Sequence, residues 1–566
     1  MNPSRLKLVE YGEWFVCVFA SLAAVWLHLV FLTHAGGFWR DEACGVATAL
    51  MPTLRELWRF LTLDSAGLVS PLLLRGWATL GLGQSDFGWR LYGMLIGVAL
   101  LGGLWFNARM LGGKWPVISL GLLAASPVLV RWGDSVRAYG LACLLMLLTL
   151  GLVWLLAQRQ SPRRFVLAAI ASVLSVHTLY GNAFLLLAVG LSASVVCLRH
   201  RQWRAIALVL GVGFIAAVSM LPYVPGVRAS SHNWWLIQKS GFLPDYVWFN
   251  FTHAAGSPYD WQAIVWEVLT PLAAVAGLVN GWRGKGPDAD LHLFAALTIV
   301  LAAGLFMLFI SLSGLQTQLW YFLPLLVLVA ACANAVLPEA LAGWFPAPVT
   351  ALPWLRVAGL AFVGGMVLIS WPRADDLARA RQTNVDQLAA YLTAKAEPGD
   401  VIVVHPWYCG VSFQRYYRGR AAWLTAPPME DHRIQRFDVL MEQMRQGDPM
   451  PPVVRNCTEA LRSGHRVWLL GSFEFNGRKP PVLPKAPHGP QGWNEGSYEE
   501  AWAAQIPYLI TNHASELAAV PEDPHQAINI FEHLPLYYAT GWRADSAPLA
   551  GRDAQAASSA GTPSKR

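Results

Sequence analysis

The sequence is poor in charged residues. Asp, Glu, Lys and Arg make up 14% of the 566 residues, against about 25% in an ordinary soluble domain. Hydrophobic residues make up 55% of the chain. This balance excludes an ordinary soluble globular protein and predicts an integral membrane protein. The 27 tryptophans fit the aromatic belts that form at the two lipid–water interfaces.

Several functional signatures are missing. The net charge of +7 comes from Lys and Arg spread among loops, with no basic stripe, so nucleic acid is not an expected partner. No Walker motif and no Gly-x-Gly-x-x-Gly motif stands at a strand–helix junction, which argues against direct use of ATP or a nucleotide sugar. The seven cysteines have no metal-ligand spacing.

Long apolar runs predict about eleven transmembrane helices, since a spanning helix needs about 20 apolar residues. The first run is long enough to span and no small-residue cleavage site follows it, so we expect it to stay in the protein. The predicted spans are 14–34, 87–108, 116–131, 138–157, 164–178, 180–198, 203–222, 261–282, 291–313, 318–337 and 354–371.

Basic residues orient these spans. The basic residues fall in alternate loops, in five groups: Arg5/Lys7, Arg109/Lys114, Arg159–Arg164, Arg199–Arg204 and Arg283/Lys285. The positive-inside rule then places the N-terminus in the cytoplasm. With an odd number of spans, everything after Trp371 is exoplasmic, which is periplasmic for a cell inner membrane. The single Asp-x-Asp of the chain, Asp288-Ala289-Asp290, falls in a cytoplasmic loop and is expected to be solvated there.

Two adjacent carboxylates, Asp41 and Glu42, follow the first span. Ionised groups at the edge of hydrocarbon usually face protein, water or substrate. The alternative is that both acids only stabilise the start of an interfacial helix. They open a long exoplasmic loop, residues 35–86, in which 54–61 and 68–82 are predicted to be interfacial helices.

Other polar residues lie at the same exoplasmic rim. Taken singly, they are explained by arginines reaching toward headgroups, by the aromatic belt, or by His177 as a hydrogen-bonded packing residue. Their coincidence on one side predicts a polar site there. The residues are Asp41, Glu42, Arg131, Asp134, Arg137, Tyr139, His177, Tyr180, Asn182, His232, Gln316, Gln318 and Tyr321.

The pattern changes at about Gln382, where a soluble α/β domain begins. Val401–Val404 and Arg466–Leu470 read as strands, with helical patterns between them, so we expect a small, largely parallel sheet. We assign 1–371 to the transmembrane domain, 382–545 to the exoplasmic α/β domain and 546–566 to a disordered tail. Cys409 and Cys457 both fall in the exoplasmic domain, where they are either bridged or two free buried thiols.

Four short motifs resemble the GT-C superfamily of integral membrane glycosyltransferases. The resemblance is strongest to the branch of protein O-mannosyltransferases and lipid A aminoarabinose transferases. The motifs are Trp39-Arg40-Asp41-Glu42, Ser135-Val136-Arg137-Ala138-Tyr139, His177-Thr178-Leu179-Tyr180 and Trp320-Tyr321-Phe322-Leu323-Pro324. Members of this family commonly have an Arg before the late Tyr, whereas this chain has Gln316, Gln318 and Trp320.

This resemblance implies a polyprenyl-phosphate-linked sugar donor and an exoplasmic acceptor hydroxyl on a lipid, glycan or protein. Asp41 is then the base, and Glu42 orients the acceptor or Asp41. Arg137, supported by Arg131, binds the donor phosphate, while Tyr139, His177, Tyr180 and Tyr321 contact substrate. A phosphate held by arginine needs no metal, so no cofactor is expected. Attack opposite the phosphate inverts the anomeric centre.

Two other functional classes remain open. One is a transporter or flippase for a lipid-linked sugar, and the other is a non-catalytic subunit for envelope assembly. Transporters often carry broken helices and charges near the midplane of the bilayer. Here the charges are at one rim and no twofold repeat is visible, which favours the transferase.

Overall fold

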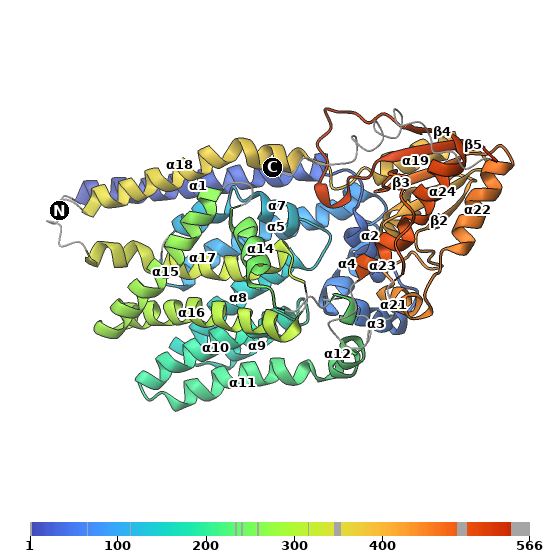
Figure 1. Cartoon of the computed structure of the whole chain (residues 1–566). Helices are drawn as coiled ribbons and strands as arrows, with labels where there is room; N and C mark the ends of the chain where they lie inside the picture. The colour runs from blue at the N-terminus through green and yellow to red at the C-terminus, as the bar shows by residue number, and fades with distance from the viewer. Residues whose placement is uncertain are drawn as a thin grey trace. The chain divides into compact units, whose positions relative to one another are not determined.

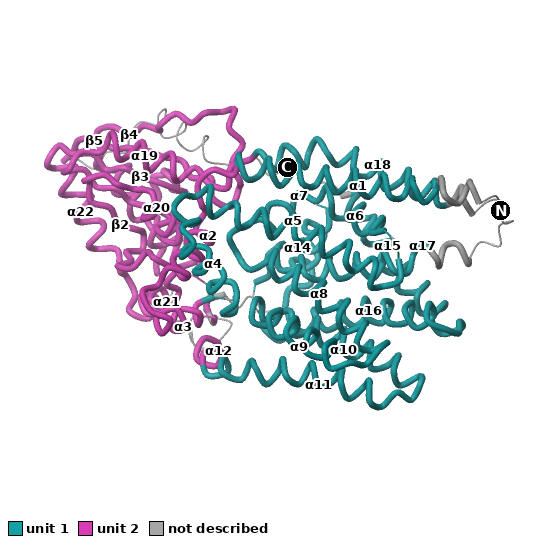
Figure 2. The backbone as a smooth tube through the Cα atoms, turned by 180° about the vertical axis from the view of Figure 1, so that it is seen from behind, with its two compact units in different colours: residues 1–34, 64–225, 241–379 teal, residues 35–63, 226–240, 380–566 magenta. Residues whose placement is uncertain are grey.

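The computed structural model describes residues 3–64, 66–113, 115–232, 235–238, 242–256, 260–314, 316–344, 352–483 and 495–544. The chain divides into two compact units (Figure 2). Unit 1 comprises 1–34, 64–225 and 241–379, and unit 2 comprises 35–63, 226–240 and 380–566. The first loop is therefore shared, with 35–63 in unit 2 and the rest in unit 1. The predicted tail 546–566 and Lys114 lie outside the described residues.

Unit 1 is a bundle of helices (Figure 1). In it α1 packs on α18, α5 on α8, and α16 on both α10 and α15. Its longer helices are α1 (Pro3–His34), α4 (Val69–Thr79), α5 (Asp86–Met110), α8 (Tyr139–Gln158), α9 (Pro162–Val176), α10 (Asn182–Arg199), α11 (Trp203–Ser219), α14 (Pro244–Gly256), α15 (Asp260–Arg283), α16 (Pro287–Ser313), α17 (Leu323–Trp344) and α18 (Leu352–Arg379).

Within the described ranges, nine helices are long and apolar enough to cross a membrane. The two other predicted spans are shorter in the structure. The run 116–131 is broken into α6 (Val117–Leu123) and α7 (Pro127–Gly133). The break occurs because Pro127 has no N–H to continue a helix and Ser126 caps the new one. The run 164–178 is the 15-residue α9.

Basic loops meet at one end of unit 1. Arg199, at the end of α10, donates hydrogen bonds to the carbonyl oxygens of Gly281, in the last turn of α15, and Gly284, which follows α15. Asp290 of α16 accepts a hydrogen bond from His200 at 2.8 Å. These contacts join two of the loops that the basic pattern assigned to one side.

Unit 2 contains a five-stranded sheet with the order β2-β1-β3-β5-β4. The strands are β1 (Val401–His405), β2 (Ala422–Thr425), β3 (Val467–Gly471), β4 (Ala514–Ala519) and β5 (Leu536–Trp542). β1 is parallel to β2 and β3, whereas β5 is antiparallel to β3 and β4. The predicted fold class is confirmed: a polytopic helical membrane protein with a C-terminal α/β domain.

Helices cover both faces of this sheet, and β1 and β3 are accordingly buried at every position. α19 (Val385–Lys395) and α20 (Gly410–Tyr416) pack on one face, with Ile402 and Val404. The other face, with Val403 and Leu469, is covered by α21 (Phe437–Gln446), α22 (Pro451–Arg462), α23 (Glu495–Ala503) and α24 (Gln505–His513). Two helices of the first loop, α2 (Arg40–Ala49) and α3 (Leu54–Phe60), complete the unit, and α2 packs on α20.

Cys409 and Cys457 belong to different cores. Cys409 packs in the cluster with Ile402, and Cys457 packs in the cluster on the opposite face of the sheet. Both are free thiols. The sheet between them rules out the disulfide and decides in favour of two buried thiols. Burial raises the pKa of the Cys457 thiol to about 12.

Candidate functional site

The segment that carries Asp41 is held firmly within unit 2. The backbone N–H of Phe38 donates to the Tyr416 hydroxyl at 2.6 Å, and Gln382 donates to the carbonyl oxygen of Ala35 at 2.8 Å. Trp39 is completely buried. Gly36 has a φ of +65°, which only glycine adopts without strain, so the chain can turn sharply into α2.

Arg40 and Glu532 form the centre of this anchorage. The Glu532 carboxylate accepts hydrogen bonds from the Arg40 N–H at 2.8 Å, the Ser412 hydroxyl at 2.7 Å and the Thr383 hydroxyl at 3.0 Å. The Arg40 guanidinium lies over the Tyr408 ring at 4.5 Å. Burial raises the pKa of Glu532 to about 7, although Arg40 and the two hydroxyls oppose the rise. Arg40 is thus a structural residue of the motif.

The Gln435 side-chain amide donates to Asp41 Oδ1 at 2.7 Å, and Arg40 Nε lies 4.0 Å from the same oxygen. The Asp41 side chain is 19% exposed, so solvent reaches it. Glu42 is completely buried. This difference follows from the helix, where adjacent side chains point about 100° apart. It favours Asp41 for contact with an acceptor and a positioning role for Glu42.

Arg137 in unit 1 binds a carboxylate with both arms of its guanidinium. Nη1 donates to Asp64 Oδ2 and Nη2 donates to Asp64 Oδ1, both at 2.9 Å. The side chains of Arg137 and Asp64 are only 10% and 15% exposed. A parallel pair of charge-assisted hydrogen bonds is the geometry in which arginine also binds phosphate.

Asp64 is placed by a backbone pairing that involves the His177 motif. Gly67 donates to the carbonyl oxygen of Thr178 at 3.2 Å, and Val69 donates to that of His177 at 3.0 Å. Gly67 is required here because a Cβ would lie 2.2 Å from the His177 carbonyl oxygen. The pairing fixes the chain that follows Asp64 against the end of α9.

His177 uses both ring nitrogens within the protein. Nδ1 is 2.9 Å from the Tyr223 hydroxyl and Nε2 is 3.0 Å from Ser219 Oγ. This favours the packing role for His177. Tyr180 packs edge-on against Tyr223, with ring centroids 5.4 Å apart, and lies within electrostatic reach of Asp64. Tyr180 therefore belongs with Arg137 and Asp64.

Tyr139 and Tyr321 meet in an aromatic cluster. Their ring centroids are 6.3 Å apart, and Trp320 contacts both rings. Trp132 packs on Trp320 at 4.4 Å. Tyr139 is buried, whereas Tyr321 is partly accessible. The cluster brings two of the sequence-predicted site residues together.

Arg131 makes a structural contact with the end of α18. Its Nη2 donates to the carbonyl oxygen of Leu377 at 2.6 Å, in the last turn of α18. A cation suits a helix C-terminus, where backbone carbonyls lack helical partners. This contact favours a capping role over direct phosphate binding.

Sequence reasoning missed Asp64, Gln435 and Glu532. Asp64 is an acid in the predicted exoplasmic loop just before Gly67, which is a usable signal. Gln435 and Glu532 lie roughly 400 and 500 residues from their partners Asp41 and Arg40, so no local pattern indicates them.

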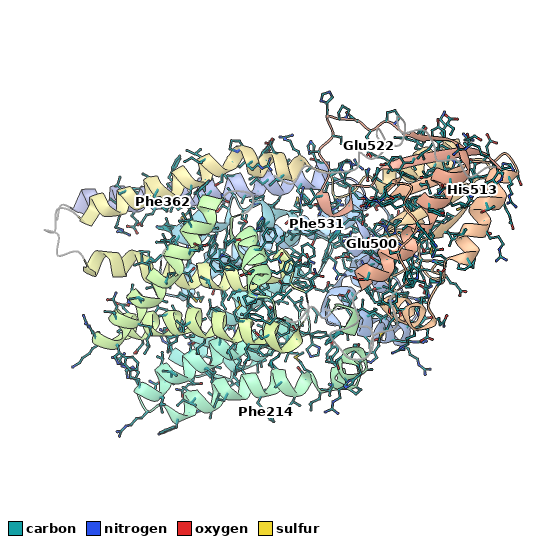
Figure 3. All side chains as sticks on the ribbon, viewed as in Figure 1. Phe214, Phe362, Glu500, His513, Glu522 and Phe531 are labelled. Atoms are coloured by element: carbon teal, nitrogen blue, oxygen red, sulfur yellow. The ribbon has the colours of Figure 1, made fainter. Side chains whose placement is uncertain are left out.

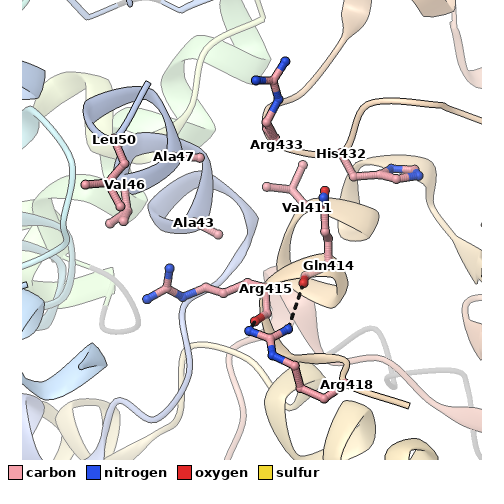
Figure 4. A pocket seen from close by; sticks show the side chains of 10 residues that line it. All are labelled: Ala43, Val46, Ala47, Leu50, Val411, Gln414, Arg415, Arg418, His432 and Arg433. Carbon is pink, nitrogen blue, oxygen red and sulfur yellow. Dashed lines mark hydrogen bonds between the residues drawn. The ribbon is translucent and has the colours of Figure 1, made fainter. Parts of the chain in front are cut away.

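A cavity of about 290 Å³ borders α2. Figure 4 shows the side chains that line it. Its apolar wall comes from Ala43, Val46, Ala47 and Leu50, and Arg415, Arg418 and Arg433 border the opposite side. Arg433 is neutralised by Asp431 through two hydrogen bonds of 3.0 Å. Arg418 donates to backbone carbonyls, including that of Tyr417 at 2.7 Å, which do not neutralise its charge. The excess of cations suits an anionic group.

No cluster of three or more His, Cys, Asp and Glu residues that could hold a metal ion occurs in the part of the chain that the structure describes.

Neither a family model nor a curated protein matches the chain. Solved structures do match. One is ArnT from Cupriavidus metallidurans bound to undecaprenyl phosphate, with a TM-score of 0.46 and 14% identity over 80% of this chain and 92% of that chain. Another is the oligosaccharyltransferase AglB from Archaeoglobus fulgidus in complex with an inhibitory peptide and a dolichol-phosphate. Its TM-score is 0.47, with 12% identity over 96% of this chain and 75% of that chain.

A third is the arabinofuranosyltransferase AftD from Mycobacteria, with a TM-score of 0.35 and 15% identity over 92% of this chain and 41% of that chain. All three are GT-C glycosyltransferases, the superfamily that the sequence motifs resemble. With TM-scores below 0.5, the likeness by itself assigns neither donor nor acceptor to this chain.

Proposed function

We propose that the protein is a membrane glycosyltransferase that moves a sugar from a polyprenyl-phosphate donor to an exoplasmic acceptor hydroxyl, with inversion. The observation that carries the proposal is the bidentate contact of Arg137 with Asp64. It presents a guanidinium at the end of a transmembrane unit in the geometry that suits two oxygens of a phosphate.

The donor phosphate needs positive charge more than it needs a proton. A phosphate leaves the anomeric carbon as a stable anion, and a fixed guanidinium stabilises the charge that develops on it. In our proposal the Asp64 carboxylate is hydrogen-bonded to the Arg137 guanidinium until the donor phosphate displaces it. Tyr180, near Asp64, then lies close to the donor headgroup.

The acceptor hydroxyl must lose its proton as the new bond forms. We assign this proton to Asp41, which is accessible and oriented by Gln435. The acceptor oxygen bonds to the anomeric carbon while the bond from that carbon to the phosphate oxygen breaks, so the configuration inverts. The proton ends on Asp41 and the electron pair leaves with the phosphate, so the step balances without a metal or cofactor.

The membrane arrangement is part of the proposal. We place the N-terminus in the cytoplasm and residues 382–545 in the periplasm, as the alternating basic loops indicate. A lipid-linked donor suits this arrangement because its tail stays in the bilayer of the inner membrane. No nucleotide then has to cross that membrane.

Incubation of the purified protein in nanodiscs with a panel of polyprenyl-phosphate sugars tests the function. Mass spectrometry follows release of the free polyprenyl phosphate and the modified acceptor in a membrane extract. We expect one donor to be consumed, and we expect Asp41→Asn and Arg137→Gln each to lower its rate of consumption by about 100-fold or more. The matched controls are Glu430→Gln and Arg159→Gln, two exposed residues outside the site.

Two results would refute the proposal. One is consumption of no donor by the wild-type protein with any extract. The other is movement of an unmodified lipid-linked sugar between leaflets of proteoliposomes, which would identify a flippase.

A further inference from the structure

A second site is indicated by the topology of the sheet in unit 2. β1 lies between two parallel neighbours, β2 and β3. After β1 the chain enters α20 on one face of the sheet, whereas after β3 it continues to α23 and α24 on the other face. The chain thus leaves two adjacent strands in opposite directions. In open α/β sheets, such a point leaves a crevice outside the carboxyl ends of the strands, where ligands bind.

The structure has a cavity of about 320 Å³ at this point. His405, the last residue of β1, and Ser472, which follows β3, line it, and α23 and α24 supply the far wall with Glu500 and Tyr508. Glu500 is labelled in Figure 3. The volume lies at the lower end of the range of about 300–1,000 Å³ that small-molecule sites have. None of these residues belongs to the site proposed for sugar transfer.

The lining is polar and its charges balance. Two carboxylates and two cations line one cavity together with two hydroxyls and an amide. These side chains are Ser472, Glu474, Asn476, Arg478, Lys479, Glu500 and Tyr508. The cavity beside α2 has excess positive charge, whereas here the formal charges sum to zero. Such a lining fits a ligand that has little net charge and can both donate and accept hydrogen bonds at many positions.

Rings and a neutral imidazole complete the cavity. Phe473 packs against His405 with ring centroids 5.4 Å apart. Burial lowers the pKa of His405, so this residue is neutral at physiological pH. His405 Nδ1 donates to the carbonyl oxygen of Ala426 at 3.0 Å, which leaves Nε2 as an acceptor in the neutral ring. Apolar ring surface beside hydrogen-bonding groups suits the alternating C–H and hydroxyl faces of a sugar.

We infer that this crevice binds a saccharide, and that it holds the glycan part of the acceptor. The second statement rests on the proposed function, whereas saccharide binding does not. A peptide fits less well because extended peptides add to exposed strand edges. β1 and β3 are interior strands, and the cavity meets their ends.

Saturation-transfer-difference NMR on the full-length protein in nanodiscs, without donor, tests the inference. The probes are mannobiose and an N-acetylglucosamine disaccharide, with a galacturonic acid dimer as the anionic probe and a neutral tripeptide as the non-saccharide probe. We expect saturation transfer to at least one neutral disaccharide. The double variant Glu500→Gln/Asn476→Ala should reduce the signal at least fivefold, since both side chains line the cavity near the surface.

Arg418→Gln, in the cavity beside α2, is the matched control and should leave the signal unchanged. Saturation transfer to none of the saccharides, transfer to the tripeptide alone, or an equal signal in the double variant would overturn the inference. Asp41→Asn should keep the signal. If the protein binds a saccharide but transfers no sugar, the proposed function fails and the binding site stands. If it transfers sugar but binds no saccharide here, only this site fails.

Discussion

Replacing Asp64 with Asn tests the Arg137 contact directly, because it removes a charge and keeps the size of the side chain. The two side chains share two hydrogen bonds of 2.9 Å and are 15% and 10% exposed. Removing one partner of a buried ion pair costs about 3–5 kcal/mol, since the other charge stays uncompensated. Because both side chains keep some exposure, we expect Asp64→Asn to lower the free energy of unfolding by about 2–3 kcal/mol.

A double-mutant cycle separates this pair from its surroundings. Asp64→Asn/Arg137→Gln leaves no uncompensated charge, so its cost should be smaller than the sum of the single costs by about 1–3 kcal/mol. The measurement is reversible unfolding in mixed detergent micelles, followed by tryptophan fluorescence, with Arg159→Gln as the control. Single costs that add within about 0.5 kcal/mol would refute the coupling.

Binding of undecaprenyl phosphate extends the same test to function. In our proposal the Asp64 carboxylate competes with the donor phosphate for the Arg137 guanidinium. Asp64→Asn should therefore bind undecaprenyl phosphate more tightly than the wild type, and Arg137→Gln should bind it more weakly. Weaker binding by Asp64→Asn than by the wild type would show that Asp64 does not compete with the phosphate.

Three further predictions concern unit 2. Asp41→Asn should lower turnover by about 10²–10⁴-fold, the contribution of a general base, with a smaller loss for Gln435→Ala; equal turnover of Asp41→Asn and wild type would contradict the assignment. Cys409 and Cys457 should react with a thiol reagent only after denaturation, and a disulfide-linked peptide in non-reducing mass spectrometry would disprove the buried thiols. Burial lowers the pKa of His432 to about 4, so the unfolded state binds more protons than the folded state between about pH 6.5 and pH 4. The free energy of unfolding should therefore fall by about 2 kcal/mol as the pH drops to about 4.5. Measured by hydrogen exchange, the His432→Gln variant should lack this contribution to the fall. An equal fall in the variant and the wild type would refute the prediction.

Hydropathy predicts most of unit 1, because the bilayer demands long apolar helices with few charges. The two exceptions are instructive. Pro127 divides one apolar run into two short helices, and α9 ends where His177 turns into the segment paired with Gly67. In both cases local backbone chemistry overrides the apolar pattern.

Only some of the strands of unit 2 can be predicted from sequence patterns. β1 and β3 are buried at every position and were predicted from continuous apolar runs. β2 has four residues and β4 alternates weakly, so neither gives a clear signal. β5 was also missed, although its Tyr and Trp residues suit a strand.

The candidate site divides in the same way. Short motifs indicated Asp41, Arg137 and Tyr180. Their partners were invisible, since Asp64 and Gln435 are recognised only through contacts that the folded chain creates. Arg131 and His177 were predicted to contact the donor phosphate and the substrate, whereas their contacts in the structure favour structural roles.

The sharing of the first loop between the two units bears on how the protein is made. Phe38 and Trp39, buried in unit 2, leave the ribosome roughly 500 residues before β5 is complete. At about 5–20 residues per second, synthesis of that interval takes about 25–100 s. During this time two large aromatic side chains lack the core that finally encloses them. An excised C-terminal segment, 380–566, would be missing α2 in turn, so a fragment intended for biochemistry has to carry residues 35–63 and 226–240 as well.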